Sequence, residues 1–190
     1  MSVSEAVVEN SFQEQFGLPS EGARTKVRGQ LTEYDQDYIR HSPFAVLATS
    51  NKDGKTDASP RGGIAGFVGV LDENHLLLPD VAGNRLFHSY GNIEENPNVG
   101  LIFFIPGLED TVRVNGAAEV VSKEHLEERK LTLSVHQPDD NAKHIQGLLI
   151  KVEEAYNHCP RALKFGALWD TETIQNNQET RPIANRQDRR

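Results

Sequence analysis

Short runs of apolar or alternating residues fill the middle of the chain, and this pattern predicts a domain built mainly from β-strands. Each run is bounded by glycine, proline, asparagine or aspartate, as is typical of strands joined by tight turns. The predicted strands are FAVLATS, TDASPRGG, GFVGVLD, HLLLP, VGLIFFI, TVRVNGAAEVV and IQGLLIKVEEAYNH. We expect them to form a small antiparallel barrel of about six strands, because closure would hide the strand edges.

Helical spacing or capping residues mark four short segments outside these runs. Thr32 suits the cap of a helix that ends before Pro43, and a second helix is expected to begin near Gly83. Ser122 can cap a short helix, and Pro160 stands where a terminal helix would begin. We expect these helices to lie at the periphery of the barrel.

The length of 190 residues and the hydrophobic content of 37% suit one core of ordinary size. We divide the chain into an N-terminal arm (residues 1–30), a barrel domain (residues 31–169) and a polar C-terminal tail (residues 170–190). The tail is polar enough to be disordered unless a partner surface holds it.

The formal net charge is -8, and the chain has no basic run, which argues against broad surfaces for nucleic acid or anionic membranes. Any anionic ligand must therefore meet a local cationic pocket. The first residues lack a signal-peptide pattern and no apolar run approaches membrane-spanning length, so we expect a soluble, cytoplasmic protein. Cys159 is the only cysteine, which excludes an internal disulfide and disfavours a cysteine-based zinc site. Its place before a predicted helix allows a somewhat acidic, reactive thiol, but we expect a buried, inert one.

Three segments carry a family resemblance: SPFAVLATSNKDGKTDASPRGG, LLLPDVAGNRLFHSYGNIEENPNVGLIFFIPG and DTVRVNGAAEVV. Their order, from Ser42 to Trp169, resembles the pyridoxamine 5'-phosphate oxidase-like flavoproteins. The resemblance implies an FMN-binding split β-barrel and a homodimer that holds each flavin in a groove between subunits. It also implies phosphate contacts at the end of the second strand and at the start of the following helix.

FMN requires cationic and N–H donor groups around a phosphate that carries nearly two negative charges. Arg61 follows the second predicted strand in a glycine-flanked segment, and Arg85 is expected in the first turn of the helix that begins near Gly83. The candidate cofactor-binding residues are Ser59, Arg61, Gly62, Asn84, Arg85, Thr111 and Arg113.

Arg113 and Asn115 alternate along one strand, so both point to the same face. We assign Arg113 to the pyrimidine edge of the flavin ring, where a positive charge favours the reduced, anionic flavin. For each arginine the alternative is an ion pair at the surface or between subunits. Leu86 stands where the vitamin oxidases commonly have a second cationic residue, so we expect the phosphate to depend on Arg61 and on backbone donors.

One loop, HQPDDNAKH, gathers groups that a metal could use, namely His136, Asp139, Asp140 and His144. No helical or strand spacing makes them converge, so we expect a solvated loop and no metal. We assign no catalytic acid, base or nucleophile, because no nucleophile motif or phosphate-binding loop is present.

These observations favour an FMN-dependent oxidoreductase that acts on a small molecule, with NAD(P)H as a candidate reductant. The alternatives are a flavin-binding or flavin-sensing protein without turnover, and a haem or deazaflavin binder on the same fold. The vitamin oxidases end in a strand segment that meets the substrate, whereas residues after Trp169 form only a polar tail. We therefore do not expect pyridoxamine phosphate oxidation.

Overall fold

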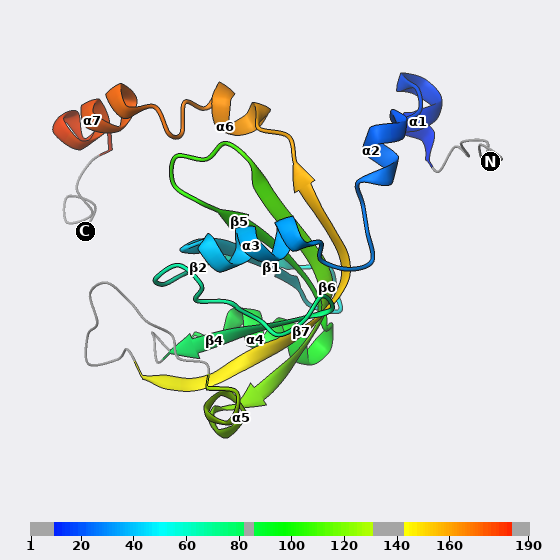
Figure 1. Cartoon of the computed structure of the whole chain (residues 1–190), viewed down its shortest axis with the longest axis vertical. Helices are drawn as coiled ribbons and strands as arrows, with labels where there is room; N and C mark the ends of the chain where they lie inside the picture. Colours follow the sequence, from blue (N-terminus) through cyan, green and yellow to red (C-terminus); the bar gives the residue numbers. More distant parts are fainter. Residues whose placement is uncertain (1–9, 82–85, 131–142, 184–190) are drawn as a thin grey trace.

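One antiparallel sheet of seven strands forms the framework of the protein (Figure 1). The computed structural model describes residues 10–81, 86–130 and 143–183. The strands are β1 (Phe44–Ser50), β2 (Thr56–Gly62), β3 (Gly69–Val70), β4 (His75–Val81), β5 (Asn98–Phe104), β6 (Thr111–Ser122) and β7 (His144–His158). The predicted mainly-β class is confirmed. All seven predicted runs contain a strand, one more than the barrel of about six strands that we expect, and the run GFVGVLD is a strand only over two residues, Gly69–Val70.

The strands follow the order β2-β1-β5-β6-β7-β4-β3, so β2 and β3 each have a single strand neighbour. The long strands β6 and β7 run through the middle of the curved sheet, with 12 and 15 residues. Their pairing register shifts between Asn115 and Gly116, which is the signature of a bulge. The barrel is therefore split, with β2 at one end of the sheet and the β4–β3 pair at the other.

The core lies on the inner face of this sheet, where alternate residues of each strand point inward. Its largest fully buried side chains on the strands include Leu47, Leu76, Leu78, Phe103, Val112, Leu148 and Ile150. Leu31 and Ile39 add apolar groups from helix α3 and the residues before it. These contacts place α3 against the interior, and α4 adds Tyr90 and Ile93 to the same core.

The helices are α1 (Ser11–Phe16), α2 (Glu21–Thr25), α3 (Glu33–His41), α4 (His88–Glu95), α5 (Lys123–Glu128), α6 (Arg161–Phe165) and α7 (Thr171–Thr180). The predicted caps at Thr32 and Ser122 and the predicted helix start at Pro160 are confirmed.

Two expectations about helices are wrong. The helix expected near Gly83 begins instead at His88, because Phe87 before it adopts a left-handed conformation with φ of 50° that cannot continue a helix backward. The tail is not wholly without structure, because residues 171–180 form α7. Its N-terminus is capped by Asp170, whose Oδ2 accepts a 2.7 Å hydrogen bond from the Thr173 N–H.

Two helical arms, α1–α2 and α6–α7, extend away from the barrel on opposite sides of the molecule (Figure 1). Their apolar side chains are largely exposed, with Phe12, Phe16 and Phe165 at 71%, 76% and 76%. Within the described residues no helix is long and apolar enough to span a membrane.

Replacing Thr32 by alanine is expected to lower the free energy of unfolding by about 1 kcal/mol. Thr32 Oγ1 accepts a 3.2 Å hydrogen bond from the Asp35 N–H, while Asp35 Oδ2 accepts a 2.9 Å bond from the Thr32 N–H. The two bonds form a capping box, and Asp35 is only 1% exposed. Urea denaturation of Thr32→Ala and Thr32→Ser measures the effect, and serine should restore most of the lost stability. Equal stability of Thr32→Ala and the wild type would contradict this account of the cap.

Candidate functional site

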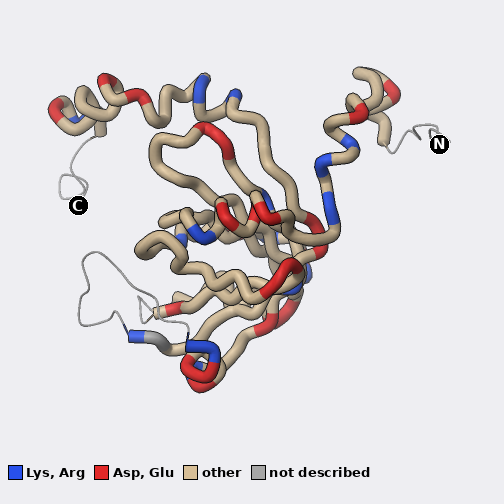
Figure 2. The backbone as a smooth tube through the Cα atoms, in the orientation of Figure 1, with Lys and Arg blue, Asp and Glu red and all other residues tan. Residues whose placement is uncertain are grey.

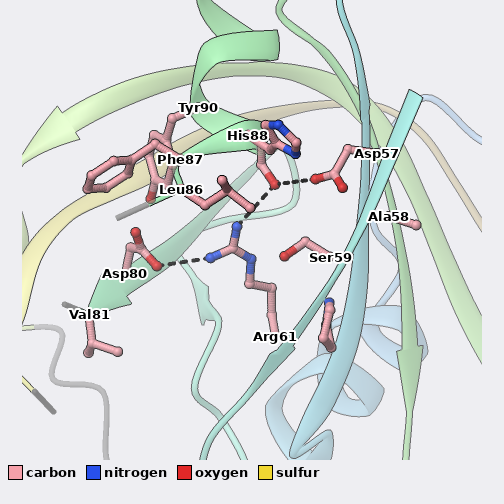
Figure 3. Close-up of a pocket in the computed structure, with 12 residues that line it drawn as sticks. Asp57, Ala58, Ser59, Arg61, Asp80, Val81, Leu86, Phe87, His88 and Tyr90 are labelled. Carbon is pink, nitrogen blue, oxygen red and sulfur yellow. Dashed lines mark hydrogen bonds and ion pairs between the residues drawn. The ribbon is translucent and has the colours of Figure 1, made fainter. Parts of the chain in front are cut away.

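A pocket of about 310 Å³ lies where β2, β4 and the N-terminus of α4 meet (Figure 3). Strand β2 contributes residues 57–61, and α4 contributes the first residues of its N-terminal turn. The pocket is lined by Asp57, Ala58, Ser59, Pro60, Arg61, Asp80, Val81, Leu86, Phe87, His88, Ser89 and Tyr90. This lining combines one guanidinium group with hydroxyl, carboxylate and aromatic groups.

A chain of hydrogen bonds crosses the pocket and fixes the guanidinium of Arg61 (Figure 3). Arg61 donates from Nη1 to Asp80 Oδ1 at 2.9 Å and from Nη2 to Ser89 Oγ at 3.3 Å. Ser89 in turn donates from Oγ to Asp57 Oδ2 at 2.9 Å. The orientation of Arg61 is therefore set from two sides, by a carboxylate on β4 and a hydroxyl on α4.

The ion pair between Arg61 and Asp80 joins the two ends of the split barrel. Arg61 belongs to β2 at one end of the sheet, and Asp80 belongs to β4 near the other end. Both side chains are mostly withdrawn from water, with exposed fractions of 17% and 13%. The stability of the fold depends on keeping both charges, because removing one would leave the other charge buried without a partner.

Several donors in this pocket have no acceptor within the described residues. Arg61 Nε is buried and has no hydrogen-bond partner. Helix α4 begins after Phe87, which provides no side-chain cap for the helix N-terminus. The first N–H groups of a helix carry partial positive charge and favour an anion. The pocket thus presents a guanidinium edge and an uncapped helix end to the same space.

The pocket also contains negative charge that sequence reasoning did not anticipate. Asp57 and Asp80 both line it, and burial together with the Asp80 carboxylate raises the pKa of Tyr90. Asp57 could have been noticed, since it alternates with Ser59 and Arg61 along β2 and must share their face. The residues around Asp80 in the sequence do not indicate its role, because its contact with Arg61 depends on the curvature of the sheet. An incoming anion would have to share Arg61 with Asp80.

The sequence profile of the pyridoxamine 5'-phosphate oxidase family matches residues 31–159, which include every strand of the barrel. The chain belongs to this family.

Curated relatives agree with this assignment, and a solved structure shares the fold. Pyridoxine/pyridoxamine 5'-phosphate oxidases from two strains of Leptospira interrogans are 38% identical over 79 residues, which cover 42% of this chain and 33% of theirs. The chain thus spans about a third of the length of the curated relatives it matches. A candidate pyridoxamine 5'-phosphate oxidase from Lactobacillus delbrueckii superposes with a TM-score of 0.50 at 22% identity, covering 68% of this chain and 95% of that protein. This likeness shows the fold.

Of the predicted cofactor residues of this oxidase-family chain, Ser59 and Arg61 line the pocket. Gly62 lines an adjoining cavity of about 170 Å³ together with Arg61. Asn84 and Arg85 lie outside the described residues, so the expected contribution of Arg85 stays a prediction. The described start of α4 at His88 nevertheless places the helix N-terminus beside Arg61, as a phosphate site requires.

Thr111 and Arg113 are not brought to this pocket within one chain. Arg61 lies opposite Ala45 on β1, and Ala45 lies opposite Phe103 on β5. Phe103 in turn lies opposite Val112 on β6. Residues directly opposite in a sheet share a face and their chain neighbours point the other way. Thr111 and Arg113 therefore lie on the face opposite Arg61, where Arg113 stacks on Tyr156 with its Cζ 5.3 Å from the ring centre.

The remaining candidates take no part in this pocket. His136, Asp139 and Asp140 lie outside the described residues, as does the side chain of His144. Elsewhere in the described ranges no three acidic, histidine or cysteine side chains gather as a metal site would require. Cys159 is exposed, so the expectation of a buried thiol is wrong. It precedes α6, which extends away from the barrel (Figure 1).

Proposed function

We propose that this protein binds FMN and acts as an FMN-dependent oxidoreductase on a small molecule. The observation that carries the proposal is the arrangement of Arg61, which is held from two sides, keeps a buried Nε without a partner and faces an uncapped helix end. Membership of the pyridoxamine 5'-phosphate oxidase family supports it independently. The proposal includes a homodimer, in which the second copy completes the groove for the flavin ring.

The residues of the pocket fit the phosphate of FMN. A phosphate accepts several charge-assisted hydrogen bonds. Arg61 Nε and the first N–H groups of α4 are donors that could form them. Asp80 and Ser89 act as positioning residues, because they fix the plane of the guanidinium. The nearby carboxylates lower the affinity for a dianion, and Arg85 would add the positive charge that offsets them.

When bound, FMN supplies hydride or electron transfer through its isoalloxazine ring, and the protein supplies position and electrostatics. Arg61 would anchor the phosphate end, which leaves the ring to extend out of the pocket. Gly62 follows Arg61 along β2 and lines the adjoining cavity. No side chain of the pocket is required as an acid or base.

The phosphate site is tested by comparing the affinities of FMN and riboflavin, which differ only in the phosphate. In the wild type we expect FMN to bind at least tenfold more tightly, which corresponds to about 1.4 kcal/mol. In the double variant R61Q/D80N this preference should largely disappear while riboflavin binding is retained. The double change removes both charges of the pair, so no buried charge is left alone. Quenching of flavin fluorescence gives both dissociation constants.

The matched control is R40Q/D37N, which removes an exposed ion pair of similar length. Arg40 Nη1 lies 3.0 Å from Asp37 Oδ1 on α3, with side chains 48% and 70% exposed. This variant should keep the preference for FMN. A wild-type protein that is colourless and indifferent to added FMN, or an R61Q/D80N variant with an unchanged preference, would contradict the proposal. Mass analysis of the released chromophore separates FMN from haem and deazaflavin.

Turnover and assembly need separate measurements. Anaerobic mixing with NADH and NADPH distinguishes a reductase, which bleaches the bound flavin, from a flavin-binding protein without turnover. Sedimentation equilibrium reports whether the protein is a dimer. A strictly monomeric protein that binds flavin at full affinity would remove the second copy from the proposed site.

A further inference from the structure

The two helical arms, α1–α2 and α6–α7, lack a packing surface within their own chain. Their helices have 6, 5, 5 and 10 residues, and none of the four contains a buried residue. Helices shorter than about 12 residues are marginally stable in water, and in proteins their stability comes mainly from packing. We therefore expect a surface outside this chain to cover both arms.

Both arms also lie beyond the part of the chain that matches the family profile, which covers residues 31–159. At the base of the first arm, the Arg28 N–H donates a 3.1 Å hydrogen bond to the carbonyl of Ala155 on β7. At the base of the second, Lys164 Nζ lies 2.9 Å from Glu109 Oε2. What covers the helices beyond these points is a property of this chain and does not follow from the shared barrel.

The first arm presents aromatic side chains, and the second presents a cavity that suits them. Phe12 and Phe16 are four residues apart on α1, so they share one face of the helix, and both are exposed. A cavity of about 410 Å³ on the α6–α7 arm has Leu163, Leu168 and Trp169 in its lining. Trp169 Nε1 is buried and has no hydrogen-bond partner within the described residues, although a buried indole N–H usually finds an acceptor. The cavity therefore suits an occupant that brings apolar side chains and an acceptor.

The match also holds in the opposite direction. The α1–α2 arm has a cavity of about 360 Å³, whose lining includes Leu18, Ala23 and Val27. The α6–α7 arm presents the exposed ring of Phe165. Each arm thus has both an apolar cavity and a protruding aromatic side chain.

The two arms carry opposite charges where they are most polar. Residues 22–30 contain three cations and no carboxylate, namely Arg24, Lys26 and Arg28. Helix α7 and its cap contain three carboxylates and no lysine or arginine, namely Asp170, Glu172 and Glu179. Figure 2 shows the blue positions where the first arm descends to the sheet and the red positions on α7. Such complementary charges favour contact between the arms. The arms lie on opposite sides of one molecule, so they cannot meet within a chain (Figure 1).

We propose that two copies of this chain exchange arms, so that α1–α2 of each copy packs on α6–α7 of the other. Phe12 and Phe16 of one copy enter the cavity that Trp169 lines in the second copy, and α7 of that copy lies beside Arg24. Two-fold symmetry repeats this contact, which covers all four arms and closes the assembly. A foreign partner would have to match two surfaces of opposite charge on opposite sides of the molecule. The proposal rests on the homodimer of the proposed function and specifies contacts that hold it together.

The fluorescence of Trp169 tests the exchange, because it is the only tryptophan of the chain. At equal flavin content, the variant F12S/F16S should emit at longer wavelength than the wild type and be quenched more strongly by acrylamide. Sedimentation equilibrium should show a dimer weakened roughly tenfold or more. Both phenylalanines lie outside the core, so the barrel should fold as before, which circular dichroism checks. The matched control is V120T, since Val120 is an exposed apolar residue on β6, outside both arms. It should match the wild type in emission and in dimer stability.

Mixing two variants shows whether the contact forms between chains. F12S/F16S has the tryptophan but a damaged first arm, whereas W169F has an intact first arm and no tryptophan. After exchange of subunits, the intact α1 of a W169F chain can reach Trp169 of the other chain. The emission of the mixture should therefore return toward the shorter wavelength of the wild type. Failure to return would overturn the proposal, because the effect would then arise within one chain.

The remaining outcomes separate this proposal from the proposed function. Equal emission of F12S/F16S and the wild type would overturn arm exchange and leave the arms to a different partner. An F12S/F16S dimer as stable as the wild type would also overturn it, while the homodimer that holds the flavin would stand. A wild-type protein that is monomeric but binds FMN would overturn arm exchange and the homodimer together, and would leave flavin binding intact.

Discussion

Replacing Arg61 by alanine should lower the free energy of unfolding by about 3 kcal/mol, in protein without ligand. The change leaves the Asp80 carboxylate, which is 13% exposed, in the pocket without its partner. The hydroxyl oxygen of Ser89 also loses the hydrogen bond that Arg61 donates to it. The expected loss is at the lower end of the range for buried ion pairs, because neither side chain is fully buried. Urea denaturation followed by circular dichroism measures it.

Two further variants separate the unpaired charge from the loss of the arginine side chain. The double variant R61Q/D80N should lose markedly less stability than Arg61→Ala, because no charge remains alone. Arg40→Ala, which breaks an exposed pair, should cost less than about 1 kcal/mol. If Arg61→Ala were as stable as Arg40→Ala, the pair between β2 and β4 would not stabilise the barrel.

Replacing Gly116 by alanine should cost about 4 kcal/mol or prevent folding. A Cβ at this position would lie 2.0 Å from the carbonyl oxygen of Lys151, which belongs to the neighbouring strand. The clash is with backbone, so no side-chain rotation relieves it, and the strands must separate at the bulge between Asn115 and Gly116. Thermal unfolding of the purified variant, or its absence from the soluble fraction, checks the expectation.

The substitution Gly91→Ala provides a control with the opposite expected effect on stability. It lies within α4, and a Cβ there would meet nothing within 4 Å. Gly91→Ala should therefore stabilise the protein by about 0.5 to 1 kcal/mol, because alanine has the higher helix propensity. A Gly116→Ala protein that melts at the wild-type temperature would show that β6 and β7 do not approach this closely.

The features that the sequence predicted well are those determined by neighbouring residues. The strands follow from short-range alternation, and the caps at Thr32 and Ser122 follow from side chains that bond to the backbone three residues onward. Helical spacing that extends back past Phe87 predicts too early a start for α4, whereas the left-handed backbone of Phe87 sets the start at His88. Propensity patterns do not indicate such a conformation in a phenylalanine.

The candidate site was predicted only in part, for a physical reason. Arg61 was identified from the charge of a phosphate, but Asp80 contacts it only because the curved sheet brings β2 and β4 together. Thr111 and Arg113 were grouped with Arg61, whereas strand register places them on the other face. A shift of one residue in register reverses the face of every side chain, and register between distant strands is not visible in local sequence.

The Arg61–Asp80 contact also affects which substitutions the ligand pocket can accept during evolution. It joins two sheet ends by side chains alone, whereas the other strand neighbours are joined by backbone hydrogen bonds that any residue type can form. Substitutions at this junction can therefore alter the size and charge of the pocket while the ladder beneath it remains intact. A barrel left open at one junction gives its ligand site more freedom to diversify than a fully closed one would.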